Sequence, residues 1–218
     1  MKQILKVIIA VGLVVALATG ANAAILNITN GTPGTIPTNQ TNDLLFPILG
    51  VNTLGGYYGS TITLAGGPAN ILVEYFGAEA GFTNSFAFPG TLFTHSGSGT
   101  TEINLPPLTT TVLNVNDGIL PFSFLYNQTG ANLTLANASN VPDNPGVANF
   151  FASVYGNPTA TSGNGIFLFL DDGAGSIENH LDNHDDLVVR LSVPSVPEPA
   201  TLLLLGLGLI GLAGLRRK

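Results

Sequence analysis

Two apolar segments, one near each end of the chain, most strongly constrain what this sequence can fold into. The first runs from Ile4 to Ala18 and the second from Ala200 to Leu215, and five of the six basic residues lie within or beside them. Segments of this kind are typical of export signals and membrane anchors rather than of a water-soluble core. Ala24 to Val196 is therefore the part that must fold in water as a domain.

The N-terminal segment, residues 1–23, predicts a secretory signal peptide. Lys2 and Lys6 supply positive charge at its start, and Ala21 and Ala23 supply the small residues that a signal peptidase requires at its cleavage site. We expect cleavage after Ala23. The alternative, a retained N-terminal anchor, is disfavoured because the apolar run is short and ends at this small-residue boundary.

The C-terminal segment predicts a transmembrane helix. Pro197-Glu198-Pro199 cannot lie in the middle of a helix, because proline lacks an amide donor. Ala200 to Leu215 would form a helix of about 24 Å, slightly shorter than a hydrocarbon core of about 30 Å. The basic residues that follow, Arg216, Arg217 and Lys218, are expected to remain in the cytoplasm and to leave the domain outside.

Together, Pro197-Glu198-Pro199, the apolar segment and the terminal basic cluster resemble the PEP-CTERM sorting signal, over residues 197–218. The resemblance implies recognition by an exosortase, an integral-membrane peptidase that cuts near the PEP motif. It also implies a route: the chain is first anchored in the inner membrane with its body in the periplasm, and then passes to the cell surface or the exopolysaccharide matrix of a biofilm. A simple tail anchor is the alternative.

The body, residues 24–196, has the pattern of an all-β domain. Short β-branched and aromatic runs alternate with turn residues, and no pattern long enough for an amphipathic helix is present. We predict an antiparallel β-sandwich, jelly-roll-like, because no crossover helices separate the strands. The expected strands are 24–28, 44–48, 60–64, 71–76, 85–88, 110–115, 120–126, 148–154, 166–170 and 187–193.

Two stretches of the body, Ile71 to Phe88 and Phe167 to Val193, are similar to segments of small exported β-domains of unknown function that often precede this kind of tail. The similarity implies fold and location, and no activity.

The charge of the body excludes one class of partner. The body contains one basic residue, Arg190, and twelve carboxylates, so its net charge is about −11 with neutral histidines. Such a surface repels phosphate backbones, and we expect no nucleic acid as partner. The chain also contains no cysteine, which removes disulfides, thiol catalysis and thiolate metal sites.

The densest polar cluster lies between two apolar strands, in residues 171–186. Bringing those strands together would crowd like charges, which repel unless a cation or protons intervene. Calcium is the expected cation because it takes six to eight oxygen ligands. The candidate ligands are Asp171, Asp172, Asp182, His184, Asp185 and Asp186.

Other interpretations of this cluster stay open. It is not an EF-hand, because the sixth position counted from Asp182 is Leu187 rather than glycine. If Asp182, His184 and Asp186 were in an extended strand, their side chains would share one face and would also suit zinc or manganese. A solvated acidic loop without metal is a further possibility. Glu74 and Glu79 are more simply interpreted as solvated turn residues, and His95 as a loop residue.

The sequence favours a non-enzymatic structural or binding body. No serine-hydrolase elbow, phosphate loop or zinc-protease motif is present. One alternative is a calcium-dependent, lectin-like module that binds extracellular polysaccharide by stacking sugars on tyrosines, namely Tyr57, Tyr58, Tyr75, Tyr126 and Tyr155. The other is an exported metal-dependent hydrolase acting through the 171–186 cluster.

Overall fold

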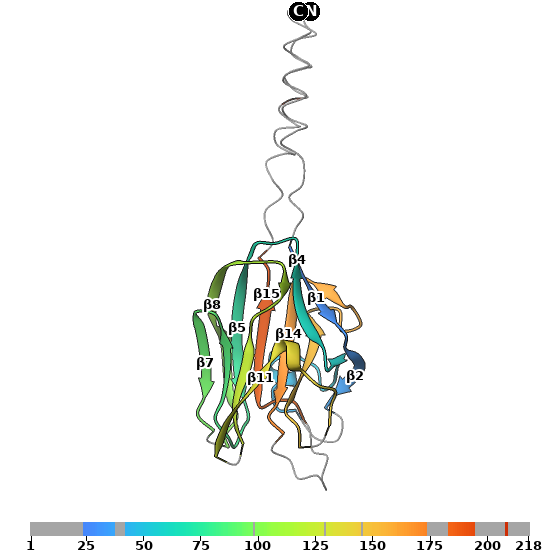
Figure 1. The fold of residues 1–218 in the computed structure, drawn as a ribbon. Helices are drawn as coiled ribbons and strands as arrows, with labels where there is room; N and C mark the ends of the chain where they lie inside the picture. The colour runs from blue at the N-terminus through green and yellow to red at the C-terminus, as the bar shows by residue number, and fades with distance from the viewer. Residues whose placement is uncertain are drawn as a thin grey trace, which may run out of the picture. The chain divides into compact units, whose positions relative to one another are not determined.

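The structure is a computed structural model that describes residues 24–37, 42–97, 99–128, 130–144, 146–173 and 183–194, together with Gly208. Apart from Gly208, the predicted signal peptide and sorting tail lie outside the described residues. Ala24–Pro194 forms one compact unit, which we call the body. The body is all-β with antiparallel strand pairing, as predicted (Figure 1).

The largest sheet has seven strands within the described residues. Every neighbouring pair in it is antiparallel. Its order is β2 (Thr32–Ile36), β3 (Leu54–Tyr58), β12 (Asn149–Val154), β14 (Gly165–Asp171), β15 (Leu187–Ser192), β5 (Ala69–Ala78) and β8 (Glu102–Val115).

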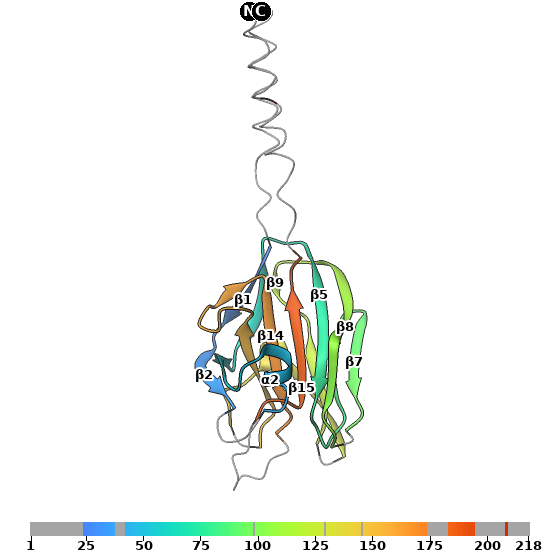
Figure 2. The same ribbon diagram turned by 180° about the vertical axis from the view of Figure 1, so that it is seen from behind.

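Two smaller sheets pack against one face of the large sheet, which gives a sandwich-like architecture (Figures 1 and 2). The first has the order β13 (Ser162–Gly163), β1 (Ile25–Thr29), β4 (Thr61–Ala65) and β9 (Gly118–Ile119). The second has the order β11 (Ala131–Ala136), β10 (Ser123–Gln128), β6 (Asn84–Phe88) and β7 (Thr91–His95). A short 3-10 helix, η1 (Asn137–Ser139), follows β11.

The central strands of the large sheet are buried on both faces. In β14, Ile166, Leu168 and Leu170 face the smaller sheets, whereas Phe167 and Phe169 face the opposite side. Strand β15 alternates in the same way. Because successive side chains of a strand point to opposite faces, a strand covered on both sides needs an unbroken apolar run, and β14 has one.

The outer face of the large sheet carries a second apolar core beneath a short helix, α2 (Leu45–Leu49). The sequence-based prediction of a strand at 44–48 is therefore wrong. The side-chain oxygen of Asn42 accepts hydrogen bonds from the amides of Leu44 and Leu45, which satisfies the start of the helix. Gly50, at φ +71°, ends it in the left-handed conformation that glycine tolerates.

Most other predicted strands are present, with different ends. The strand expected at 110–115 begins eight residues earlier, at Glu102, and the strand expected at 120–126 begins at Ser123. Strands β2, β3, β7 and β11 and the two-residue strands β9 and β13 were not predicted. Strands β2, β3, β7 and β11 have partly exposed or exposed positions along most of their lengths, so their sequences lack a strong apolar signal.

Arg190, the one basic residue of the described body, is fixed on the outer face of the sheet. It lies opposite Glu74 in the pairing of β15 with β5, and its Nη2 donates a 2.6 Å hydrogen bond to the Glu74 carboxylate, with a second bond from Nε. Its guanidinium also lies 4.8 Å from the ring centre of Tyr155. Glu74 is therefore a buried ion-pair partner and not the solvated turn residue expected from the sequence.

The two ends of the body differ in what they carry. The start of β1 and the end of β15 lie at one end, because Ile25 pairs with Ala65 at the end of β4 and Ser192 pairs with Leu72 near the start of β5. We call this the tail end (Figure 1). Strand β14 runs from the tail end to the opposite end, where Asp171 is its last residue and Asp172 follows it, and β15 returns from there. We call this opposite end the acidic end.

We expect Phe150→Ala to destabilise the body by about 3 to 5 kcal/mol. Phe150 is fully buried, and its ring lies 5.7 Å from those of Phe122 and Phe124, so the truncation leaves a cavity between sheets. Urea denaturation measures the change. As control, Leu92→Ala, at a side chain that is 61% exposed, should alter stability by no more than about 0.5 kcal/mol. Equal effects of the two substitutions would contradict the assigned core.

Candidate functional site

The acidic end is built by the pairing of two neighbouring strands. Leu170 of β14 lies opposite Leu187 of β15, so the residues that follow β14 and those that precede β15 meet. The amide of Asp186 donates to the carbonyl of Leu170, which extends the pairing by one step. The two apolar strands that flank the acidic segment therefore pair as neighbours, which is the condition under which the sequence predicts crowding of like charges.

Three carboxylates converge at this point. One oxygen atom from each of Asp171, Asp172 and Asp186 lies within 4.8 Å of the other two. We call these three residues the aspartate cluster. Backbone amides hold two of them in place: the amide of Asp172 donates to Asp186 Oδ2 at 2.7 Å, and that of Gly173 donates to Asp171 Oδ1 at 2.8 Å.

Asn84, which begins β6, reaches the cluster from another sheet. Its Nδ2 donates a 2.8 Å hydrogen bond to Asp172 Oδ2. The residue is fully buried, yet its Oδ1 has no hydrogen-bond donor within the described part of the chain. A buried acceptor left without a donor is unusual and costs about 1 to 3 kcal/mol. An amide oxygen in this position is chemically suited to bind a hard cation.

Burial and mutual repulsion make ionisation of this site unfavourable. The pKa of Asp186 is raised well above its usual range, first by burial and then by the charges of Asp172, Asp171 and Asp185. These causes would all be offset by a bound cation. Without one, the raised pKa of Asp186 means that its carboxyl group would retain a proton at a pH where aspartate is normally ionised.

Asp185 belongs to a second acidic group beside the first. Its Oδ2 accepts a hydrogen bond from the amide of Asp43 at 3.0 Å, and its Oδ1 is buried with no hydrogen-bond partner among described residues. Burial raises the pKa of Asp185 to about 8, and the charges of Glu79 and Asp43 add to the shift. Burial and Asp43 also raise the pKa of Glu79.

His184 faces an aromatic environment and does not join the aspartate cluster. Its Nε2 lies 2.9 Å from Asn149 Oδ1, and its ring centre lies 5.3 Å from that of Tyr58 and 6.1 Å from that of Phe151. Burial lowers the pKa of His184 to about 4, although Asp171 and Asp143 act in the opposite direction. His184 is therefore neutral at neutral pH.

The structure brings together three of the six predicted metal ligands, Asp171, Asp172 and Asp186. Asp185 and His184 lie nearby with other partners, and Asp182 lies outside the described residues. The alternation that would place Asp182, His184 and Asp186 on one face requires an extended chain. That condition is not met, because His184 has φ +54°, in the left-handed region.

Sequence reasoning missed Asn84 as a candidate ligand. It lies far from the acidic segment in the chain and approaches only because β6 packs at this end, so no local pattern identifies it. Glu79 was expected to be a solvated turn residue, yet its amide donates to the carbonyl of Asp185 at 2.8 Å and its carboxyl group lies in the second acidic group.

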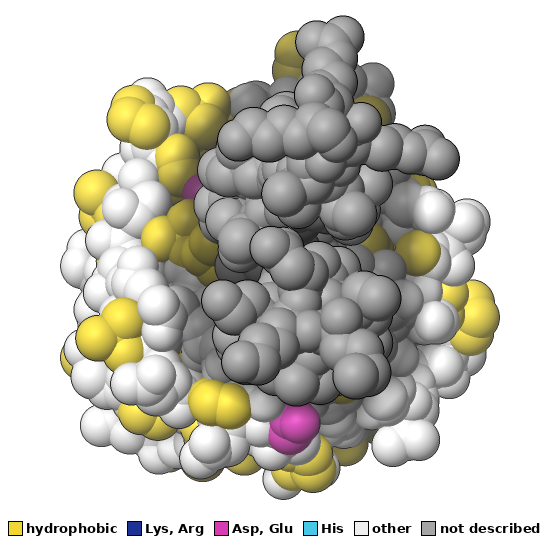
Figure 3. Space-filling view, turned by 90° about the horizontal axis from the view of Figure 1, so that it is seen from above, with side chains coloured by type: hydrophobic (Ala, Val, Ile, Leu, Met, Phe, Trp, Pro, Cys, Tyr) yellow, Lys and Arg dark blue, Asp and Glu magenta, His cyan; other side chains and the backbone are white. Residues whose placement is uncertain are grey.

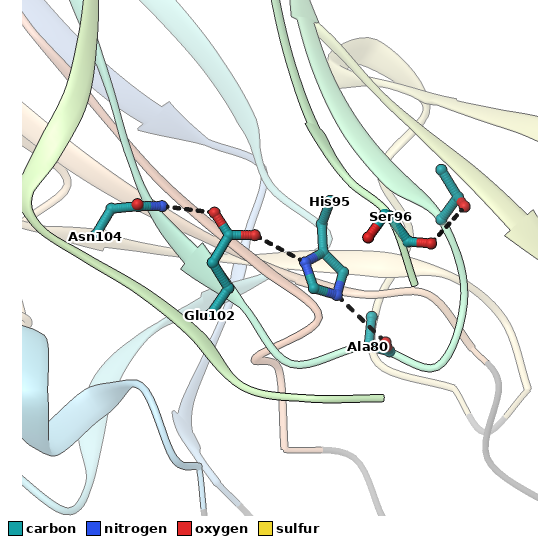
Figure 4. Close-up of polar contacts among 6 residues, drawn as sticks. Ala80, His95, Ser96, Glu102 and Asn104 are labelled. Atoms are coloured by element: carbon teal, nitrogen blue, oxygen red, sulfur yellow. Dashed lines mark hydrogen bonds and ion pairs between the residues drawn. The ribbon is translucent and has the colours of Figure 1, made fainter. Parts of the chain in front are cut away.

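A further polar group at the acidic end links β7, β8 and the segment after β5 (Figure 4). The ring of His95 is buried between the Glu102 carboxylate, 3.0 Å from its Nδ1, and the Ala80 carbonyl, 3.4 Å from its Nε2. Burial tends to raise the pKa of Glu102, but the hydrogen bonds that its carboxylate makes with His95 and Asn104 lower it below its usual range. His95 is thus a buried strand residue rather than the loop residue expected.

The tyrosines considered for sugar stacking differ in accessibility. Tyr58 and Tyr75 are buried, at 8% and 1% exposure, and Tyr57 and Tyr126 are partly buried. Tyr155, at 59%, presents most of its ring to solvent. A stacking platform could therefore involve Tyr155, but not Tyr58 or Tyr75.

Comparison with known proteins identifies the C-terminal segment. Residues 195–218 match the PEP-CTERM protein-sorting motif. This motif implies an exported protein that is processed by an exosortase, a membrane peptidase, so the resemblance seen in the sequence is confirmed. Neither curated proteins nor solved structures yield a match. Within the described residues, no helix is long and apolar enough to span a membrane.

We expect the metal-free body to lose stability as the pH rises from 6.5 to 8. Because the pKa of Asp185 is raised to about 8 on folding, the folded state holds a proton that the unfolded state releases, and this stabilisation is lost as the pH passes through that value. The lowered pKa of His184 has the opposite effect, a rise of stability with pH, but this effect is confined to pH values below about 6.5. Urea denaturation in a chelator should show a fall of up to about 1.4 kcal/mol per pH unit for each such group.

The substitution Asp185→Asn tests whether Asp185 causes this pH dependence, because it removes the ionisable group with little change in shape. It should reduce the dependence of stability on pH. Asp117→Asn, at an exposed carboxylate distant from the acidic end, is the matched control and should leave the dependence unchanged. Stability that is flat or rises between pH 6.5 and 8 would contradict the prediction.

Proposed function

We propose that this protein is an exported component of the cell surface or extracellular matrix, with a non-enzymatic structural body stabilised by calcium at the aspartate cluster. The observation that carries the proposal is the sorting motif at residues 195–218, at the end of a chain whose body is a single all-β unit. The motif supports export and processing at the membrane, and the acidic end supports cation binding by the body.

The proposed route begins at the N-terminus. A signal peptide of residues 1–23 starts export and is removed by signal peptidase after Ala23. The apolar segment 200–215 then spans the inner membrane, held by Arg216, Arg217 and Lys218 on the cytoplasmic side. The body is thereby left in the periplasm. Cleavage near Pro197-Glu198-Pro199 by the exosortase releases it towards the surface or the exopolysaccharide matrix.

Calcium is the cation that best suits the aspartate cluster. Calcium–oxygen distances are about 2.3 to 2.6 Å, so two oxygens bound to the same ion lie at most about 5 Å apart. The three carboxylate oxygens fall within that limit, at 4.8 Å or less. The Asn84 Oδ1 could add a fourth protein ligand. Zinc or manganese is less favoured, because the nearby imidazole of His184 is directed at Asn149 rather than at the carboxylates.

A cation in this position would stabilise the contact between three strands. The cluster draws on the end of β14, the start of β15 and, through Asn84, the start of β6 in a facing sheet. Neutralising the three charges would remove the repulsion that opposes this arrangement. The proposed role is therefore stability of the exported body in an environment where calcium is available.

The body could also bind extracellular polysaccharide, as a lectin-like module. The observation that favours this second function is the exposed ring of Tyr155, beside the guanidinium of Arg190. It is the weaker candidate because two of the three guanidinium nitrogens of Arg190, Nε and Nη2, already bind Glu74. The hydrolase alternative gains no comparable support.

We expect calcium to raise the thermal unfolding midpoint of the mature protein. At a free concentration one hundred times the dissociation constant, the gain in stability is about 2.7 kcal/mol, or about 5 to 10 °C for a domain of this size. Calorimetry with calcium and with chelator measures it. Asp186→Asn should abolish most of the shift, whereas the control Asp117→Asn should retain it. An unchanged midpoint in the unsubstituted protein would remove the calcium proposal.

We expect Glu198→Ala to block processing of the tail. The carboxylate is the charged group of Pro197-Glu198-Pro199, and its loss should leave the full-length precursor in the membrane fraction, as judged by immunoblotting of fractionated cells. The matched control is Thr201→Ala, two residues beyond Pro199 in the apolar segment, which should be processed as usual. Normal processing and surface delivery of the Glu198→Ala protein would show that the tail is only an anchor.

A further inference from the structure

The register of the strands places four chain segments together at the tail end. Ala65 pairs with Ile25, and Ala69 pairs with Val115. The turn between β4 and β5 therefore lies beside the start of the body and beside the turn between β8 and β9. Asp117 joins the two turns by accepting a hydrogen bond from the amide of Gly67. Strand β15 ends beside the start of β5, so Pro194 lies at the same end.

Large apolar side chains are exposed around this end. Leu113, near the end of β8, is 65% exposed, and Ile119, in β9, is 56% exposed. Leu92, just after the turn between β6 and β7, is 61% exposed. A pocket between these turns is lined in part by Phe88, Pro89, Val115, Ile119 and Pro121. Seen from this end in Figure 3, hydrophobic side chains occur in several places on the surface of the body.

The charged side chains of the body gather at the other end. Eight of the described carboxylates lie at the acidic end: Asp43, Glu79, Glu102, Asp143, Asp171, Asp172, Asp185 and Asp186. Glu74 is paired with Arg190 on the face of the sheet. Among the described residues, this leaves Asp117 as the one carboxylate of the tail end, where Figure 3 shows few acidic side chains. The tail end is therefore nearly uncharged and partly apolar.

The length of the connecting chain limits how far this end can be from a membrane that holds the tail. Five residues, 195–199, lie between Pro194 and Ala200, where the apolar segment begins, so the two are six Cα–Cα steps apart. Fully extended, these steps span at most about 20 Å. Such a short connection keeps the tail end at high effective concentration next to the lipid headgroups, so weak contacts suffice to hold it there.

We propose that, before processing, the tail end of the body rests on the outer surface of the lipid bilayer, with Leu113 and Ile119 in contact with the interfacial region. The inference rests on the proposed function, because it requires the tail to span the membrane. The chemistry suits a lipid surface: apolar side chains enter the boundary between headgroups and acyl chains, and the repulsive carboxylates are placed at the far end of the body.

The protein contains no tryptophan, so a single introduced tryptophan reports on its own surroundings. The test uses the full chain reconstituted in phosphatidylcholine vesicles, with and without brominated acyl chains that quench tryptophan fluorescence. Leu113→Trp and Ile119→Trp place the reporter at the tail end. Ile103→Trp is the matched control, because Ile103 lies at the opposite end of β8 from Leu113 and is 43% exposed.

The expected result is that brominated lipid lowers the fluorescence of both tail-end reporters at least twofold, while the Ile103→Trp signal is unchanged. Equal quenching of all three, or no quenching of any, would overturn the inference. If the tail-end reporters become shielded only when the exosortase is added, the surface docks that enzyme instead of lipid, and the inference is also overturned. Resistance of the chain to extraction from the vesicles by alkaline carbonate, which removes proteins bound only at the surface, separately tests whether the tail is inserted in the membrane.

Discussion

The repulsion among Asp171, Asp172 and Asp186 is the constraint on which the proposed role of the body depends. The three residues cannot separate, because the strands that carry them are locked in register. Both β14 and β15 bury alternating side chains on the two faces of the large sheet, and a shift of one residue would exchange the two sets. The hydrophobic effect therefore holds the carboxylates together against their own charge, and a cation is the simplest way to stabilise the result.

This constraint also organises the molecule along its length. Strand β15 connects the aspartate cluster directly to Pro194, three residues before Pro197, the first residue of the Pro-Glu-Pro tripeptide. The body thus has a charged end, suited to cations, and a nearly uncharged end, from which the chain continues into the tail. Under the proposed function, the charged end would bind calcium and the nearly uncharged end would lie next to the membrane before processing. The charge distribution of the body is thus consistent with the sorting signal, because the nearly uncharged end is the one that leads into the tail.

The sequence predicted the features that depend on strong local patterns. The tail was recognisable because proline, glutamate, an apolar segment and terminal basic residues occur in order. Strands β14 and β15 were predictable because strands buried on both faces require continuous apolar runs. By contrast, the run at 44–48 is too short to distinguish strand from helix by composition. The signal that decides it is the capping oxygen of Asn42, together with Gly50 after the last turn.

The candidate site was only partly predictable for a different reason. Asp171, Asp172 and Asp186 flank two strands that are adjacent in sequence, so their approach could be foreseen. Asn84 and Asp43 reach the acidic end through long-range packing, which no local pattern records. His184 was misjudged because its backbone turns into the left-handed region and directs the ring into an aromatic contact with Tyr58.

The most direct measurement is a crystal structure of the mature protein grown with saturating calcium. Our account predicts one ion bound about 2.3 to 2.6 Å from carboxylate oxygens of Asp171, Asp172 and Asp186, with the side-chain oxygen of Asn84 in or beside its coordination sphere. An empty site, in which these carboxylates instead share protons through short hydrogen bonds to one another, would contradict it.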